Sequence, residues 1–149
     1  MRVISVPLTV DAEGGYSHDP ASVGDTIRAL VDAGAVGVNL EDGSQPPEAL
    51  GAKIAAARRA AAQAGVELFI NARTDVFLRG LVAPEARVAE TLARAARYRD
   101  AGCDGIFVPK VSDSATIAAL VAGTELPLNV MMVPDCPRSR RSRISACGA

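Results

Sequence analysis

The chain is poor in aromatic residues and contains no long apolar run. Only 3% of its 149 residues are aromatic while 49% are hydrophobic, so Ala, Val, Leu and Ile must build the core. Such a composition suits buried parallel strands covered by alanine-rich helices. No apolar run approaches the ~20 residues that a membrane-spanning helix needs. We therefore expect one domain with a sizeable core and no association with a membrane.

Cysteine, histidine and net charge are also scarce. Cys103, Cys136 and Cys147 have the spacing of neither a zinc site nor a disulfide framework, and their odd number favours reduced thiols. No cleavable leader follows Met1, so we expect a cytoplasmic protein. The single histidine, His18, is expected on an exposed loop, and no Ser-His-Asp or Cys-His pair can be assembled. The net charge of −1 argues against a nucleic-acid partner.

Short strand-like and helical patterns alternate along the chain. Five brief runs rich in branched aliphatic residues are predicted as buried parallel strands, at residues 3–10, 36–40, 67–71, 105–108 and 128–132. Helical patterns lie between them, at residues 21–33, 47–64, 84–101 and 114–122. Pro47 and Pro84 stand where first-turn prolines belong, and Ser112 or Asp113 could cap the fourth helix. The sequence therefore predicts one βα unit used repeatedly.

Repeated βα units form either a barrel or an open doubly wound sheet. Polar residues favour the barrel, because they follow each strand instead of gathering at one switch point: Asp11, Glu13, Glu41, Asp42, Arg73, Asp75 and Lys110. No glycine-rich phosphate loop of the Rossmann or Walker type is present. The predicted fold class is therefore α/β, of the (β/α)8 barrel type but incomplete.

Three carboxylates, on Asp11, Glu13 and Glu41, follow two consecutive predicted strands. The ends of neighbouring parallel strands lie together, so these side chains would converge and repel one another. A hard divalent cation resolves this repulsion, and Mg²⁺, or Mn²⁺ in its place, suits such oxygen ligands. The alternative is that one or two of the three cap helices or pair with arginine.

Other polar residues could bind a ligand at the same edge. Arg73 follows the third predicted strand and could grip a carboxylate or phosphate with its planar fork, although an ion pair with Asp75 or Glu41 is the simpler explanation of this residue taken alone. Gly14, Gly15 and Tyr16 would let the backbone approach a ligand closely, but a simple turn predicts the same glycines.

Several motifs together resemble the isocitrate lyase/phosphoenolpyruvate mutase superfamily. They lie at residues 10–16, 39–42, 70–75, 104–109 and 127–131. The resemblance implies a (β/α)8 barrel acting on small 2-oxo acids, whose C–C or P–C bonds are made or broken with the help of Mg²⁺. It also implies that Asp11, Glu13 and Glu41 surround the metal, some through bound water, and that Arg73 holds the substrate anion. Asn129 is expected near the pocket.

The chain departs from that superfamily in two respects. The stretch at residues 43–48 lacks the Cys and His of the lyase loop and the Lys and Asn of the mutase loop. The chain resembles only strands three to seven of the barrel. We therefore expect residues 1–137 to form a partial barrel domain, catalytically incompetent alone, whose full-length parent is compatible with a homo-oligomer. A non-catalytic remnant and a different Mg²⁺-dependent barrel aldolase are the alternatives.

The last twelve residues, 138–149, differ from the body of the chain. They hold four of its 16 basic residues and no Asp or Glu. We expect this basic tail to lie outside the fold. Its Arg, Ser, Ala, Cys and Gly are typical of GC-rich DNA read out of frame. A genuine basic tail that binds an acidic partner is the alternative.

Overall fold

The computed structural model describes residues 6–131, and these form a curved, five-stranded parallel sheet. Its strands are β1 (Leu8–Asp11), β2 (Ala35–Glu41), β3 (Phe69–Arg73), β4 (Gly105–Val108) and β5 (Leu128–Val130). Each strand pairs with the next one along the chain, so the spatial order equals the sequence order. An open doubly wound sheet would reverse its order at a switch point. The strand order is therefore that of a barrel.

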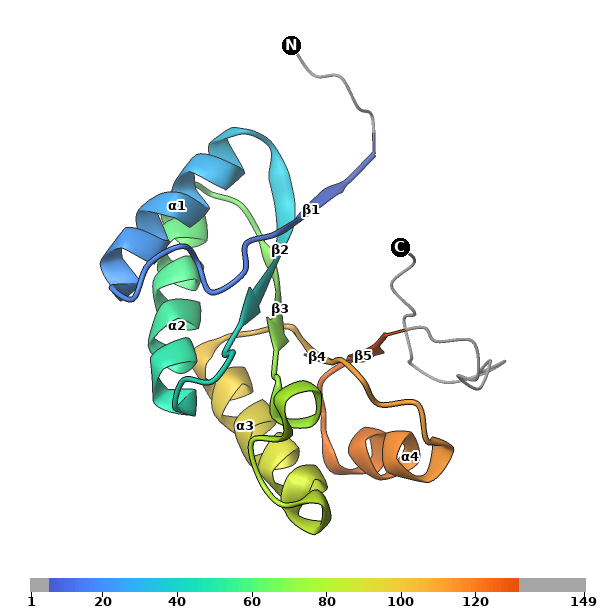
Figure 1. Ribbon diagram of the computed structural model, residues 1–149. Helices are drawn as coiled ribbons and strands as arrows, with labels where there is room; N and C mark the ends of the chain where they lie inside the picture. Colours follow the sequence, from blue (N-terminus) through green and yellow to red (C-terminus); the bar gives the residue numbers. More distant parts are fainter. Residues whose placement is uncertain (1–5, 132–149) are drawn as a thin grey trace.

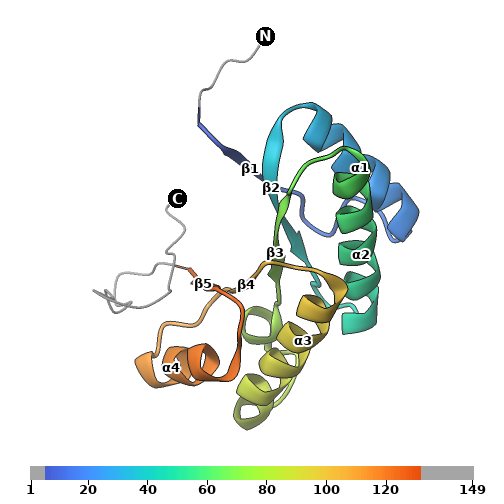
Figure 2. The same cartoon turned by 180° about the vertical axis from the view of Figure 1, so that it is seen from behind.

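The helices lie along one side of the sheet, which Figures 1 and 2 show from opposite directions. They are α1 (Pro20–Asp32), α2 (Pro47–Gln63), α3 (Arg87–Ala101) and α4 (Ser114–Gly123). No helix of the described part covers the other side of the sheet (Figure 1). The expected α/β class, with five strands of a (β/α)8-type barrel, is confirmed. None of the described helices is both long and apolar enough to cross a membrane.

Alternate residues of each strand divide between the two faces of the sheet. Apolar residues face the helices and form the core, among them Val38, Leu40, Ile70, Ala72 and Ile106. The registers place polar residues at the intervening positions, on the face that the helices leave uncovered: Asn39, Glu41, Asn71, Arg73 and Asn129. The core therefore lies between sheet and helices, and the uncovered face is left for polar groups.

Helix ends follow the predicted chemistry. Gly34, Gly65 and Gly102, which follow three of the helices, have left-handed φ values of 102°, 70° and 105°, the conformation in which glycine ends a helix. Asp113, and not Ser112, caps α4 by accepting a hydrogen bond from the backbone N–H of Thr116.

Several element boundaries differ from the prediction, and the third strand is Phe69–Arg73 where residues 67–71 were predicted. The first described strand begins at Leu8, while residues 3–5 of the predicted run, residue 132 of the last one and the tail 138–149 lie outside the described residues. The third helical segment begins with a 3₁₀ turn, Pro84–Ala86. The α-helix α3 starts only at Arg87, with Ala86 as its N-cap. A π-helical turn, Val76–Gly80, follows β3 where a loop was expected.

Candidate functional site

Three ionisable side chains end consecutive strands at the carboxyl edge of the sheet. Asp11, Glu41 and Arg73 are the last residues of β1, β2 and β3. Glu41 and Arg73 are register partners, and Asp11 pairs with Asn39 on β2. The shared parity of these positions puts the three residues on the face that no described helix covers. The expectation that polar groups gather at this edge is confirmed for these residues.

Arg73 joins two carboxylates. Its Nη1 lies 2.8 Å from Oε2 of Glu41, and its Nε donates to Oδ1 of Asp75 at 2.8 Å. Its guanidinium carbon also stands 5.9 Å from the centre of the Phe107 ring. The fully buried Asp75 carboxylate receives a second hydrogen bond from Nε of Arg79. Both ion pairs offered as alternatives for Arg73 are therefore present, and they hold the guanidinium in one orientation.

The pKa of Glu41 is raised above its usual value. Burial is the largest cause, the nearby Arg73 opposes it, and the charges of Asp75 and Asp11 raise the pKa further. Asp11 is thus close enough to Glu41 for their charges to interact. A divalent cation placed between them would remove this repulsion.

Glu13 stands apart from that pair. Its backbone N–H donates to Oδ1 of Asp11 at 3.1 Å, while its side chain is exposed. Glu13 and Tyr16 have left-handed φ values of 47° and 57°, and Gly15 between them has 83°. Asp11 is exposed as well, but its charge raises the pKa of Glu41, whereas Glu13 is not among the charges that do so. The structure therefore brings Asp11 near Glu41 and does not group all three predicted metal ligands.

The carboxylate oxygens of Asp11 and Glu41 fit a Mg²⁺ ion that keeps most of its bound waters better than an ion coordinated by protein atoms alone. Within residues 6–131, no three His, Cys, Asp or Glu side chains are grouped so that they could hold an ion by themselves. Mg²⁺ is usually held by one or two carboxylates and keeps several waters. Asp11 and Glu41 satisfy that requirement, and Glu13 could reach the ion only through water.

Three asparagines form a hydrogen-bonded row across the uncovered face. Asn129 Nδ2 donates to Asn71 Oδ1 at 2.9 Å, and Asn71 Nδ2 donates to Asn39 Oδ1 at 3.0 Å. The row crosses β4 above Gly105, where a Cβ atom would stand 2.9 Å from Asn71 Oδ1. Of these three asparagines, only Asn129 was predicted from the sequence to lie near the pocket. Asn39 and Asn71 stand two residues before Glu41 and Arg73 on the same strands and so face the same side of the sheet. This alternation is the sequence signal that would have found them.

Asp42 directly follows Glu41, but its carboxylate is buried. Its Oδ2 accepts from Arg94 Nη1 at 2.8 Å and from the Tyr98 hydroxyl at 2.7 Å, and its Oδ1 accepts from the Asp75 backbone N–H at 2.9 Å. Burial and the Asp42 charge raise the pKa of Tyr98, so its hydroxyl remains a donor. Asp42 therefore ties β2 to α3 and to the residue that orients Arg73.

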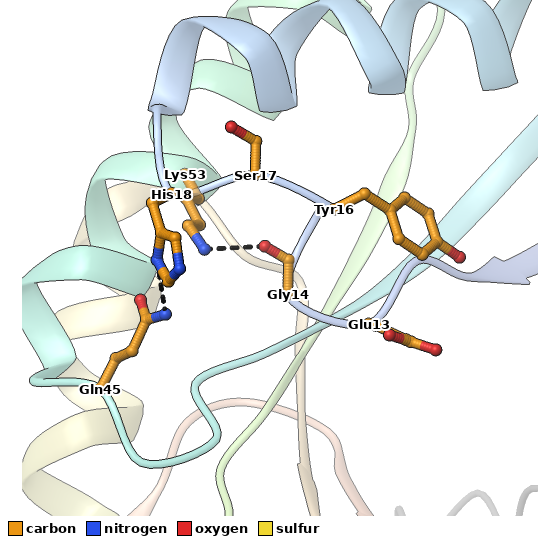
Figure 3. A pocket seen from close by; sticks show the side chains of 7 residues that line it. All are labelled: Glu13, Gly14, Tyr16, Ser17, His18, Gln45 and Lys53. Carbon is orange, nitrogen blue, oxygen red and sulfur yellow. Dashed lines mark hydrogen bonds between the residues drawn. The ribbon is translucent and has the colours of Figure 1, made fainter.

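An open pocket of about 190 Å³ lies beside the turn after β1 (Figure 3). It is lined by Glu13, Gly14, Tyr16, Ser17, His18, Gln45 and Lys53. The exposed His18 matches its predicted loop position, and its Nδ1 lies 3.0 Å from Nε2 of Gln45. Lys53 Nζ donates to the Gly14 carbonyl at 2.8 Å. Lys53 was not predicted from the sequence as a site residue, although it lies on the apolar face of α2 beside Leu50 and Ile54.

Comparison with known proteins shows close sequence relatives. An uncharacterised protein of Mycobacterium tuberculosis is 37% identical over 131 residues, a match covering 85% of this chain and 47% of that protein. The oxaloacetate decarboxylase of Rhodopseudomonas palustris (strain ATCC BAA-98 / CGA009) is 30% identical over 158 aligned positions, covering 99% of this chain and 54% of that enzyme. The chain thus spans about half the length of the curated relatives it matches.

Solved structures share the fold. A protein of Burkholderia cenocepacia J2315, provisionally described as a phosphonomutase, is 46% identical, with a TM-score of 0.84 over 90% of this chain and 57% of that one. Oxaloacetate acetylhydrolase is 25% identical, with a TM-score of 0.74 over 89% of this chain and 48% of that one. The family model for phosphoenolpyruvate phosphomutase matches residues 1–148, a range that includes most of the basic tail. This chain therefore belongs to the phosphoenolpyruvate phosphomutase family, within the phosphoenolpyruvate mutase/isocitrate lyase superfamily.

Proposed function

We propose that this chain supplies the metal- and anion-binding edge of a Mg²⁺-dependent lyase or mutase that acts on C–C or P–C bonds of small 2-oxo acids. One observation carries the proposal. Asp11, Glu41 and Arg73 end three consecutive strands on the sheet face that the described helices leave uncovered. Catalytic groups of barrel enzymes come from these strand ends.

Asp11 and Glu41 would hold the cation, with Glu13 acting through bound water. Mg²⁺, or Mn²⁺ in its place, would supply Lewis-acid polarisation of the substrate carbonyl. Pairing with Arg73 opposes the protonation of Glu41 that burial favours. Arg73 therefore favours the ionised form of Glu41 that metal coordination requires, against the effect of burial.

Arg73 would also hold the substrate anion. Asp75 anchors the guanidinium through Nε, so the Nη edge beside Glu41 is presented in a fixed direction. A planar fork held in this way suits bidentate binding of a carboxylate or phosphonate. The amide row ending in Asn129 would form the floor beneath the substrate, and the backbone of Gly14, Gly15 and Tyr16 would border it.

The reaction class is supported by the family and by the names of the relatives. Family membership favours 2-oxo acid chemistry over that of an unrelated barrel aldolase. Oxaloacetate decarboxylases that align with 99% of the chain make oxaloacetate a substrate to test first. We further propose that the catalytic unit is a complete barrel located in the cytoplasm, compatible with a homo-oligomer.

A product assay tests this proposal. The barrel would be completed from the DNA that flanks the reading frame and incubated with Mg²⁺ and oxaloacetate, phosphonopyruvate or methylisocitrate. We expect turnover of one substrate, with its products identified by NMR, and loss of that turnover in Asp11→Ala. If no substrate reacts faster than with Mg²⁺ alone, the non-catalytic remnant is the correct interpretation. Aldol products from other acceptors would instead indicate the aldolase.

A further inference from the structure

Lys53 is a buried lysine of α2 that lines the pocket beside the turn after β1. Its side chain is only 3% exposed, and it projects from α2 between the core residues Leu50 and Ile54. Lysine is among the residues least often buried, because its charge loses hydration. A lysine kept at such a position therefore needs a specific partner.

The partner that the structure provides does not balance the charge. Nζ donates one hydrogen bond, to the Gly14 carbonyl at 2.8 Å, although an ammonium group has three donors. No carboxylate oxygen of residues 6–131 is within the 4.0 Å that defines an ion pair with Lys53. Burial lowers the pKa of Lys53, with no neighbouring charge contributing. A buried cation without a counter-charge is unfavourable unless an anion binds beside it.

The pocket beside Lys53 offers further donors. Figure 3 shows Lys53, His18 and Gln45 gathered on one side of the turn, while the Glu13 and Tyr16 side chains extend away on the other side. With Gln45 Nε2 donating to His18 Nδ1, the neutral ring carries its proton on Nε2, which is then a donor. The Ser17 hydroxyl is another donor on the pocket wall.

We propose that this pocket binds a small oxyanion, with Lys53 as the counter-charge and Ser17, His18 and Gln45 as hydrogen-bond donors. Asp11, Glu41 and Arg73 do not line the pocket, so its hydrogen-bond donors are not the groups proposed to bind the metal and the substrate anion, although both sites border the turn at residues 13–16. Anion binding here would be linked to the turn through the Gly14 carbonyl, which Lys53 already contacts.

The composition of the chain makes the test direct. His18 is the only histidine, so its imidazole NMR signals need no further assignment. Lys53 and Lys110 are the only lysines, and Lys110 is exposed, which makes it an internal control. The 149-residue chain, labelled at histidine and lysine, would be titrated with inorganic phosphate and with acetate at constant ionic strength set by chloride.

We expect saturable shifts of the His18 and Lys53 signals with phosphate or acetate, while the Lys110 signals stay constant. The anion that gives the tighter binding identifies the site as one for phosphoryl or for carboxylate groups. Lys53→Met should weaken this binding at least roughly 30-fold, because it removes the buried charge, while Lys110→Met should leave it unchanged.

The wild-type titration decides the outcome even if Lys53→Met does not fold. Absence of saturable shifts with both anions would overturn the proposal, as would equal shifts at Lys53 and Lys110. Neither result bears on catalysis, so the proposed function would be tested separately.

Discussion

At the scale of single residues, Arg73 shows how a sequence ambiguity is resolved. The sequence allowed a substrate clamp or an ion pair with Asp75 or Glu41, and the structure contains both ion pairs. The pairs are compatible with anion binding, because they fix the orientation of a guanidinium that lies at a strand end. Spacing alone could not predict this, since it does not reveal side-chain direction.

We predict that Arg73→Lys lowers kcat/KM of the completed barrel about 10- to 100-fold, the equivalent of a charge-assisted hydrogen bond. A lysine cannot contact Glu41, Asp75 and the substrate anion with one planar fork. Arg79→Lys is the matched control, because Arg79 binds the same Asp75 from an exposed position. Its kcat/KM should change less than about fivefold. Equal losses in the two variants would contradict the clamp role.

Asp42 provides a second prediction at this scale. Asp42→Ala should lower the free energy of unfolding by about 3–5 kcal/mol, because it removes one of the two carboxylates that pair with the buried Arg94 and leaves the buried Tyr98 hydroxyl without its acceptor. Glu48→Ala removes another carboxylate that pairs with an arginine of α3, but that pair is exposed and should contribute less than about 1 kcal/mol. Urea denaturation of the 149-residue chain measures both values. Similar losses would show that the Asp42 network is not a stabilising centre.

At the scale of elements, periodicity predicted most of the secondary structure. All four helices and five strands were found in order, because their apolar residues recur with the helical or strand period. The π-helical turn Val76–Gly80 was missed, since it has too few residues for any period to show. Lys53 was missed for the opposite reason: it follows the helical period of core residues but has the wrong chemistry.

The close packing of the asparagine row against Gly105 of β4 gives a prediction about stability. Gly105→Ala should destabilise the chain by about 1–3 kcal/mol, because the new Cβ would crowd Asn71 Oδ1 at 2.9 Å and the Phe69 ring at 3.1 Å. The same change at Gly51, inside α2, meets only the Ala101 Cβ at 3.9 Å and should stabilise by up to about 1 kcal/mol. Thermal unfolding compares the two. A neutral Gly105→Ala would mean that the row tolerates the added methyl group.

At the scale of the whole molecule, residues 6–131 form a sheet whose outer strands are β1 and β5. The barrel type could be predicted because polar residues follow the predicted strands. Closure of the barrel could not be predicted, because the chain spans about half the length of the curated relatives it matches. The polar residues of the candidate site lie on the sheet face that the described helices leave uncovered. They can therefore be identified although the described strands do not form a closed barrel around them.

We predict that the 149-residue chain alone turns over none of the three 2-oxo acids, while the completed barrel turns over one of them. The barrel that completes such a site has eight strands, and residues 6–131 supply five of them. Product formation is followed by NMR under identical conditions for both proteins. Turnover by the short chain at the rate of the completed barrel would contradict this expectation.

The metal site is the central claim, and calorimetric titration of the 149-residue chain with Mg²⁺ and Mn²⁺ tests it most directly. We expect saturable binding that Asp11→Ala abolishes, because only one carboxylate of the Asp11–Glu41 pair then remains. Asp25→Ala, which removes an exposed carboxylate from α1, should bind the ion as the unaltered chain does. Equal binding by the unaltered chain and Asp11→Ala, or no binding by either, would contradict the account.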